Sequence, residues 1–280
     1  MAAPEAGERR RAKDAPPREA TVLRAERLTP AMVRLVLGGP DLVGLDVGAS
    51  SDRYVKLLFP ERAVDGRPPV RAYTVRSWDA AASQMTIDVV VHGTGDDAGI
   101  AAAWAASARP GDTVRFRGPG GGYAPRPEAP WHLLLGDESA LPAIAAAAEA
   151  VPRGVPVLAV VEVASPAEEQ PLASPGRLDV RWVHRGPGTP AGQSLVAAAG
   201  ALDLVALQAE HGGAPQVFLH GEAGAVRSVR RTLRAAGLAA GDLSASGYWR
   251  LGRSDEAWRT EKRGWNEAVA ADDAELAGPA

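Results

Sequence analysis

The chain has 280 residues, which at about 150 residues per domain indicates two domains or one large one. Its 46% hydrophobic and 23% charged residues are typical of a globular protein and exclude wholesale disorder. The absence of cysteine excludes disulfides, thiolate zinc sites, iron–sulfur clusters and a cysteine nucleophile. A net charge of −3 gives no general attraction to nucleic acid or to anionic lipid.

The N-terminal residues 1–19 are interpreted as a disordered leader. Three arginines at positions 9–11 resemble part of a twin-arginine export signal, but prolines 16 and 17 follow where such a signal needs an apolar region. No later segment approaches the roughly 20 apolar residues of a membrane span. We therefore expect a cytoplasmic protein without membrane insertion.

The first part of the chain, residues 20–128, consists of short β-rich runs separated by turns. Alternation of polar and apolar residues predicts two half-buried strands, Ala20–Arg27 and Met32–Leu37, joined by a turn at 28–30. Four more strands are predicted at Tyr54–Phe59, Arg71–Ser77, Met85–Val91 and Thr113–Arg117, with one helix at about Ile100–Ala108. Six strands and one helix in about 100 residues predict an antiparallel β-barrel.

A glycine- and proline-rich stretch, 118–130, predicts a linker to a second domain at 129–280. Beyond it, predicted strands alternate with predicted helices. The strands are Trp131–Leu135, Val155–Val163, Leu178–His184 and Gln216–His220, and the helices lie near 140–150, 193–199 and 223–236. Such alternation is typical of an α/β domain with a parallel sheet.

The most informative motif is Arg71-Ala72-Tyr73-Thr74-Val75-Arg76. On a strand its odd-numbered side chains share one face and its even-numbered side chains the other. An isolated match of this kind is more often an ordinary strand with surface arginines. Here, however, His92 closes a later strand and Gly99 opens the predicted helix, whose free backbone N–H groups favour a phosphate. Together these are the components of a flavin nucleotide site.

Several further segments accompany this motif in a fixed order. They are Val55–Pro60, Val90–Gly93, Trp104-Ala105, Gly111-Asp112, Gly118–Gly121, Gly136–Ile144, Glu168–Gln170, Gly221-Glu222 and Gly247–Arg253. With them, nearly the whole chain after the leader resembles the siderophore-interacting protein family of flavin-dependent ferric-siderophore reductases, which are related to ferredoxin–NADP⁺ reductases.

The resemblance implies FAD as the cofactor of the barrel. Tyr73 would lie against the isoalloxazine ring and Thr74 would hydrogen-bond near its N5 and O4, so these two are the expected catalytic residues. Arg71 would neutralise the FAD phosphates, and His92 would lie near the ribityl or pyrophosphate group. The other expected FAD contacts are Arg76, Val91, Thr94, Gly99 and Ala101. One departure is Ile100, which stands where the family usually has proline.

The second domain lacks a G-x-G-x-x-G fingerprint after its first strand. The resemblance implies that NADPH or NADH meets two strand-to-helix turns, formed by Asp137, Glu138, Ser139, Gly221 and Glu222. Ser139 is also a natural helix N-cap, and the two interpretations are compatible. Four arginines in the predicted helix 223–236 are interpreted as a solvated face, with recognition of a 2′-phosphate as the less favoured alternative: Arg227, Arg230, Arg231 and Arg234.

An anionic substrate would need a local basic patch, because the chain as a whole is acidic. Lys56 is one of only three lysines and is the first candidate, with Arg250 and Arg253 completing the patch; an ordinary exposed strand residue is an equal alternative for Lys56. Trp258 and Trp265, seven residues apart, are predicted to be a core pair on one helix face. The five histidines show no metal-ligand spacing, so no metal site is predicted.

The resemblance implies FAD-dependent reduction of ferric siderophores by NAD(P)H, with release of Fe²⁺ by a monomeric enzyme. Ferredoxin stays open as the electron donor. Two alternatives also stay open. One is a general flavin-dependent reductase that passes electrons to a protein partner, and the other is a siderophore-binding protein without turnover.

Overall fold

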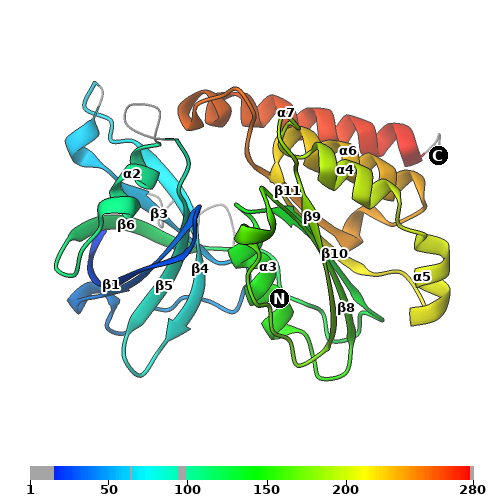
Figure 1. The fold of residues 1–280 in the computed structure, drawn as a ribbon, viewed down its shortest axis with the longest axis horizontal. Helices are drawn as coiled ribbons and strands as arrows, with labels where there is room; N and C mark the ends of the chain where they lie inside the picture. The colour runs from blue at the N-terminus through cyan, green and yellow to red at the C-terminus, as the bar shows by residue number, and fades with distance from the viewer. Residues whose placement is uncertain (1–15, 64, 94–98, 278–280) are drawn as a thin grey trace. The chain divides into compact units, whose positions relative to one another are not determined.

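The computed structural model describes residues 16–63, 65–93 and 99–277 (Figure 1). The chain divides after Ala124 into two compact units. Each unit has its own hydrophobic core.

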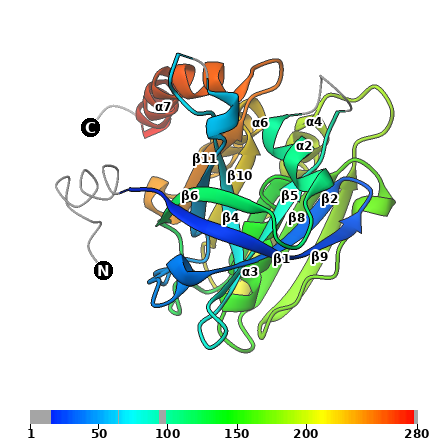
Figure 2. The same cartoon turned by 90° about the vertical axis from the view of Figure 1, so that its left-hand side faces the viewer.

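The first unit is a closed antiparallel barrel with the strand order β1-β2-β5-β4-β3-β6 (Figure 2). Its elements are β1 (Arg18–Thr29), β2 (Met32–Gly38), β3 (Tyr54–Leu58), β4 (Val70–Asp79), β5 (Gln84–Val90), α2 (Ile100–Ser107) and β6 (Thr113–Gly120), with short 3₁₀ turns η1 (Pro40–Leu42) and η2 (Pro60–Arg62). The predicted six-stranded barrel is therefore confirmed.

Alternating side chains fill the barrel interior. Leu35, Leu57 and Ile87 are fully buried there, and α2 adds Ala101 and Ala105 to the same cluster. Figures 1 and 2 show α2 at one end of the barrel.

Two predicted boundaries of the barrel unit were wrong. β1 begins at Arg18, inside the predicted leader, because its first residues pair with β6. Residues 1–15 of that leader lie outside the described residues. The predicted linker also starts too early, since β6 continues to Gly120 and Tyr54 pairs with that glycine.

The second unit is a five-stranded parallel sheet with the order β11-β10-β7-β8-β9. Its strands are β7 (His132–Asp137), β8 (Pro156–Val163), β9 (Arg177–His184), β10 (Gln216–Glu222) and β11 (Leu243–Trp249). Its helices are α3 (Leu141–Ala150), α4 (Gln193–Gly200), α5 (Leu204–His211), α6 (Ala223–Ala235) and α7 (Asp255–Ala277), with 3₁₀ turns η4 (Pro166–Glu168) and η5 (Ala240–Asp242). The predicted parallel α/β architecture is confirmed.

Helices α4, α6 and α7 cover one face of this sheet and α3 covers the other (Figure 1). Trp258 and Trp265 of α7 are buried with ring centroids 5.9 Å apart, which confirms the predicted core pair. Two elements of this unit, β11 and α5, were not predicted from the sequence. β11 is an edge strand that opens Leu-Ser-Ala-Ser-Gly, and small polar residues hide the strand pattern.

The strand order places a topological switch point between β7 and β10. From β7 the chain builds outward through β8 and β9, and it then returns to β10 on the other side of β7. Connections that leave β7 and β10 in opposite directions open the crevice where α/β proteins bind ligands. The polar residues at the ends of these strands are therefore the first candidates for a site in this unit.

Candidate functional sites

The predicted flavin residues of the barrel lie at one of its ends. β4 carries Arg71, Tyr73 and Thr74, and it runs antiparallel to β5. The first residues of β4 and the last residues of β5 therefore lie at the same end, where Val91 and His92 follow β5. Arg71 and Tyr73 are half-buried, whereas Thr74 is buried. Tyr73 packs against the barrel core with part of its ring surface.

The N-terminus of α2 adds backbone donors to this end of the barrel. Gly99 occupies the N-cap position and has no side chain with which to cap the helix. A Cβ at Gly99 would lie 3.3 Å from Cε1 of His92, so the imidazole lies against the helix start. The structure thus brings together three predicted residues, His92, Gly99 and Ala101, the last of which lies in the first turn of α2. Thr94 lies outside the described residues.

The expected face alternation along β4 breaks at Arg76. Val75 pairs with Ile87 but Ser77 pairs with Thr86, so Arg76 is an extra residue in a β-bulge. Thr74 and Val75, which precede the bulge, are both buried although neighbours on a regular strand point to opposite faces. The predicted alternation of faces is therefore wrong beyond Val75, because a bulge changes the direction of side chains without changing the hydrophobic pattern.

Lys56 lies on the exposed surface of β3, with its ammonium 5.8 Å from the ring centroid of Tyr54. Directly opposite, on β6, is Arg117, which is also exposed. Like charges directly across a strand pair cost stability. Sequence reasoning missed Arg117, because only the strand register places it beside Lys56.

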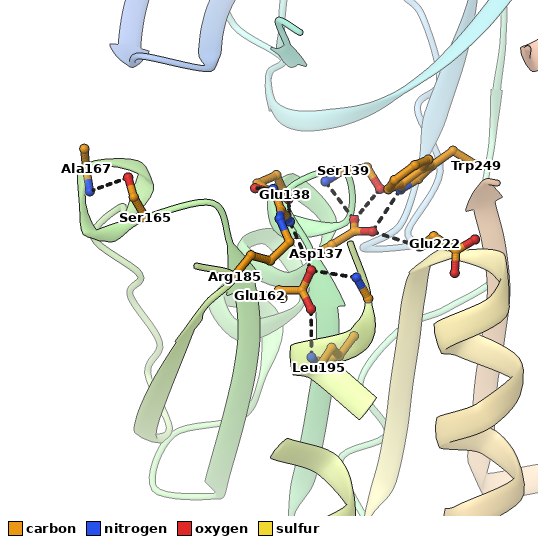
Figure 3. A network of polar contacts seen from close by, with 11 residues as sticks. Asp137, Glu138, Ser139, Glu162, Ser165, Ala167, Arg185, Leu195, Glu222 and Trp249 are labelled. Atoms are coloured by element: carbon orange, nitrogen blue, oxygen red, sulfur yellow. Dashed lines mark hydrogen bonds and ion pairs between the residues drawn. The ribbon is translucent and has the colours of Figure 1, made fainter. Parts of the chain in front are cut away.

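In the second unit, Asp137 connects the ends of three strands (Figure 3). Its carboxylate is 1% exposed and accepts hydrogen bonds from Ser139 N (2.9 Å) and Ser139 Oγ (2.5 Å) on Oδ1. Oδ2 accepts from Glu222 N and from Trp249 Nε1, both at 2.8 Å. Burial raises the pKa of Asp137, and the hydrogen bonds from Ser139 and Trp249 oppose that rise.

A second cluster links the ends of β7, β8 and β9. Arg185 pairs with Glu138 at 2.5 Å and with Glu162 at 3.0 Å. Glu162, fully buried, also accepts from Gly192 N and Leu195 N at the start of α4, each at 2.7 Å. Burial lowers the pKa of Arg185, but hydrogen bonds and charges from both glutamates outweigh it and the net shift is upward.

Carboxylates of the chain itself thus occupy two helix N-termini at this edge of the sheet. Glu162 serves α4, and Glu222 caps α6 by accepting from Ala225 N at 2.7 Å. At α3 the N-cap residue is Ala140, so the predicted N-cap role of Ser139 was wrong. Instead, both the backbone N–H and the hydroxyl of Ser139 donate hydrogen bonds to the carboxylate of Asp137, two residues earlier in the chain. Sequence reasoning missed Glu162, although a glutamate inside the apolar run Val-Val-Glu-Val was a signal.

The prediction of a solvated arginine face on α6 was wrong for Arg230 and Arg234, whose side chains are 10% and 14% exposed, whereas those of Arg227 and Arg231 are 39% and 48% exposed. Each one forms an ion pair with α7: Arg227 and Arg231 with Asp272, and Arg230 and Arg234 with Asp273. The hydrogen bond from Arg227 holds the pKa of Asp272 below its usual value. These arginines therefore stabilise the packing of α7 on α6.

Arg250 and Arg253, the predicted substrate residues, follow β11 and are exposed. Both are near Glu261 of α7, at 3.6 Å and 2.7 Å. The Arg250 guanidinium also lies 6.0 Å from the Trp258 ring centroid. An anion that binds these arginines would compete with Glu261.

Among the residues that the structure describes, no group of three or more histidine, aspartate or glutamate side chains is arranged to hold a metal ion. In the same ranges, no helix is both long and apolar enough to cross a membrane.

Comparison with known protein families identifies two matching models. The siderophore-interacting protein model matches residues 129–252, and the siderophore-interacting FAD-binding domain model matches 21–66 and 61–123. The chain belongs to the siderophore-interacting protein family. The resemblance drawn from the sequence motifs is thereby confirmed, as is FAD as the predicted cofactor of the barrel.

Two relatives have assigned reductase activities. Ferric vibriobactin reductase ViuB of Vibrio cholerae is 30% identical over 269 residues, which cover 88% of this chain and 94% of that protein. The NADPH-dependent ferric-chelate reductase of Escherichia coli is 34% identical over 143 residues, covering 45% of this chain and 54% of that protein. These relatives support an oxidoreductase.

Solved structures agree with the fold. A siderophore utilization protein from T. fusca is 38% identical with a TM-score of 0.68, covering 86% of this chain and 95% of that chain. The FAD/NAD binding domain of nitric oxide dioxygenase from Vibrio cholerae is 16% identical with a TM-score of 0.60, and the match covers 82% of this chain and 98% of that domain. The second likeness shows the fold alone, a barrel followed by a parallel α/β unit.

The donor set at the end of the barrel fits FAD. A dinucleotide needs donors for its diphosphate and a flat apolar surface for its ring. Here the first-turn amides of α2 lack a side-chain cap from Gly99, and Arg71 lies at the same end. Tyr73 supplies a half-buried aromatic face.

Proposed function

We propose that this protein reduces ferric siderophores with electrons from NAD(P)H, through FAD held by the barrel. The observation that carries the proposal is the arrangement of Arg71, Tyr73, His92 and the start of α2 at one end of the barrel, in a chain of the siderophore-interacting family. Bound FAD would supply the conversion of a two-electron hydride donor into the single-electron steps that Fe³⁺ requires.

The residues of the chain would bind and orient in this reaction. The Arg71 guanidinium and the first amides of α2 would bind the diphosphate by charge-assisted hydrogen bonds. The Tyr73 ring would lie against the flavin, and the Thr74 hydroxyl would donate to the edge of the ring that gains electrons. Arg76, Val91, His92 and Ala101 would complete the contacts to the cofactor.

At the sheet edge of the second unit, the nicotinamide nucleotide would meet the turns at Glu138–Ser139 and Gly221-Glu222. Asp137 belongs to the same edge, but its oxygens already accept four hydrogen bonds. Reduced ferredoxin is the alternative electron donor.

Lys56 of the barrel unit is one proposed contact for the ferric siderophore, and Arg250 and Arg253 of the second unit are proposed separately as contacts for the same class of anion. Catecholate and hydroxamate siderophores hold Fe³⁺ with hard, anionic oxygens, and these ligands bind Fe²⁺ far more weakly because of its lower charge density. Reduction is therefore release, and it requires no protein ligand to the iron. The role of the side chains is to bring in an anionic chelate against the net negative charge of the protein.

The visible spectrum of the purified protein tests this function. We expect a flavin spectrum that bleaches on anaerobic addition of NADH or NADPH and returns on addition of a ferric siderophore, while a ferrous-selective dye reports Fe²⁺. Bleaching by reduced ferredoxin alone would overturn the nicotinamide assignment and leave the siderophore assignment intact. A flavin that only a redox protein reoxidises would favour the general reductase, and a colourless protein would favour a siderophore carrier.

A further inference from the structure

Asp137 is a buried carboxylate whose ligands all come from the chain itself. It lies at the end of β7, and β10 separates it from β11. Its indole partner, Trp249, is the last residue of β11, so the Asp137–Trp249 hydrogen bond of 2.8 Å spans two strand spacings (Figure 3). The half-buried Trp249 is thereby held in place by the hydrogen bond from its indole N–H to Asp137, which is 1% exposed.

The backbone of β10 and β11 has two local features that permit the Asp137–Trp249 hydrogen bond. Gly221 has φ +141°, and a Cβ there would lie 2.7 Å from Asp137 Oδ2, so a side chain at this position would displace the carboxylate. On β11, Gly247 is opposite Gly221 but Trp249 is opposite Glu222, which makes Tyr248 an extra residue. This irregularity turns Trp249 to the position from which its N–H reaches Asp137.

Glu222 holds the chain on the other side of Arg250. Its Oε1 accepts from Leu251 N at 3.2 Å, while its own N–H donates to Asp137. The residue before Arg250 is thus fixed by Asp137, and the residue after it by Glu222. Arg250 itself is exposed and lies at the end of this support.

We infer that Asp137 is a positioning residue that fixes Trp249, and through it Arg250, for binding an anionic ferric siderophore. The inference rests on the proposed role of Arg250 in substrate binding. A carboxylate held only by neutral donors in a buried site resists displacement, because each donor would otherwise lose its partner. The hydrogen bonds of Asp137 therefore hold the ends of β7, β10 and β11 together, and the backbone that carries Arg250 is fixed in position.

The test measures binding to the FAD-loaded protein with gallium(III) complexes, which have the shape of the ferric complexes but are not reduced. One probe is a gallium tris-catecholate of charge −3, and the other is an uncharged gallium trihydroxamate. Trp249→Phe keeps an aromatic side chain and removes the N–H donor, together with part of the ring volume. We expect this variant to raise the Kd for the tris-catecholate about tenfold and to leave the Kd for the trihydroxamate unchanged.

A double-mutant cycle separates the inference from the proposed function. Arg250→Ala is expected to weaken tris-catecholate binding, and Trp249→Phe is expected to add nothing in the Arg250→Ala background. Arg263→Ala, an exposed arginine of α7 paired with Glu267, is the matched control and should have no effect. Asp137→Asn should weaken binding at least as much as Trp249→Phe; if it does not fold, the Trp249 cycle alone decides.

Three outcomes would overturn the inference. Normal binding by Trp249→Phe together with weak binding by Arg250→Ala would show that the hydrogen bond positions nothing, while the substrate site stands. Normal binding by Arg250→Ala would remove that arginine from the substrate site and the inference with it. Equal weakening for both probes would assign Trp249 a general structural role.

Discussion

The two units of this protein use their polar groups in opposite ways. At the end of the barrel, the start of α2 has glycine as its N-cap and so keeps backbone donors for a ligand. At the edge of the parallel sheet, Glu162 and Glu222 cap α4 and α6 from within the chain, and Asp137 accepts four internal hydrogen bonds. The start of α2 thus has no side-chain cap, and we propose that its backbone donors bind the cofactor, whereas the sheet edge uses its carboxylates to hold its own loops in place.

The largest expected effect tests the internal role of these carboxylates. Glu162→Ala removes the acceptor of two backbone N–H groups and one partner of Arg185 from a fully buried position. We expect it to lower the free energy of unfolding of the second unit by about 3–5 kcal/mol without any ligand present. Urea unfolding followed by tryptophan fluorescence would measure this, since five of the seven tryptophans lie in that unit.

Glu169→Ala is the matched control for that prediction. Glu169 pairs with His184 at 2.7 Å, but both side chains are more than a third exposed. Its removal is therefore expected to cost under about 1 kcal/mol. A similarly small loss for Glu162→Ala would show that the carboxylates of the sheet edge are not structural.

The intermediate effect tests the barrel. Arg71→Ala is expected to weaken FAD binding about 10- to 100-fold, because it would remove the proposed charge-assisted contact to the diphosphate, worth about 1–3 kcal/mol. Its effect on the unfolding of the FAD-free protein should be much smaller. Flavin content after dialysis and FAD titration of the apoprotein would measure both.

Arg115→Ala provides the comparison on the same barrel. This exposed arginine of β6 lies 4.0 Å from Glu19, and we expect its removal to leave FAD affinity unchanged. Equal flavin retention by the Arg71 and Arg115 variants would mean that the motif on β4 does not serve the diphosphate.

The same contrast explains what the sequence could predict. The barrel, the parallel sheet and the Trp258–Trp265 pair follow from hydrophobic periodicity, which is a local signal. The bulge at Arg76 and the Arg117–Lys56 pair depend on strand register, which no single segment encodes. The ion pairs of α6 were missed because their partners on α7 lie about 40 residues away, and charge spacing alone looks the same on a solvated helix.

The smallest expected effect concerns a buried polar side chain of the second unit that, unlike the carboxylates of the sheet edge, has no hydrogen-bond partner. His132 is fully buried at the start of β7, and neither of its ring nitrogens has a hydrogen-bond partner. Burial, together with the positive charge of Arg126, lowers the pKa of His132 to about 4. In the unfolded chain the pKa of histidine is about 6.5, so on acidification the unfolded state takes up the proton first.

The contribution of His132 to stability therefore falls as the pH decreases from about 7 towards 4, with a loss of about 1 kcal/mol between pH 7.5 and 5.5. His132→Leu removes the titrating group without leaving a polar atom unpaired, so we expect little change in stability at pH 7.5. At pH 5.5 the variant should be more stable than the parent by about 1 kcal/mol, while His220, whose pKa burial lowers to about 3, keeps its own pH dependence in both proteins. Urea unfolding at a series of pH values would measure the difference. Parallel pH curves for the two proteins would mean that His132 finds a proton acceptor in the folded state, and the sheet unit would then be internally paired at this position as well.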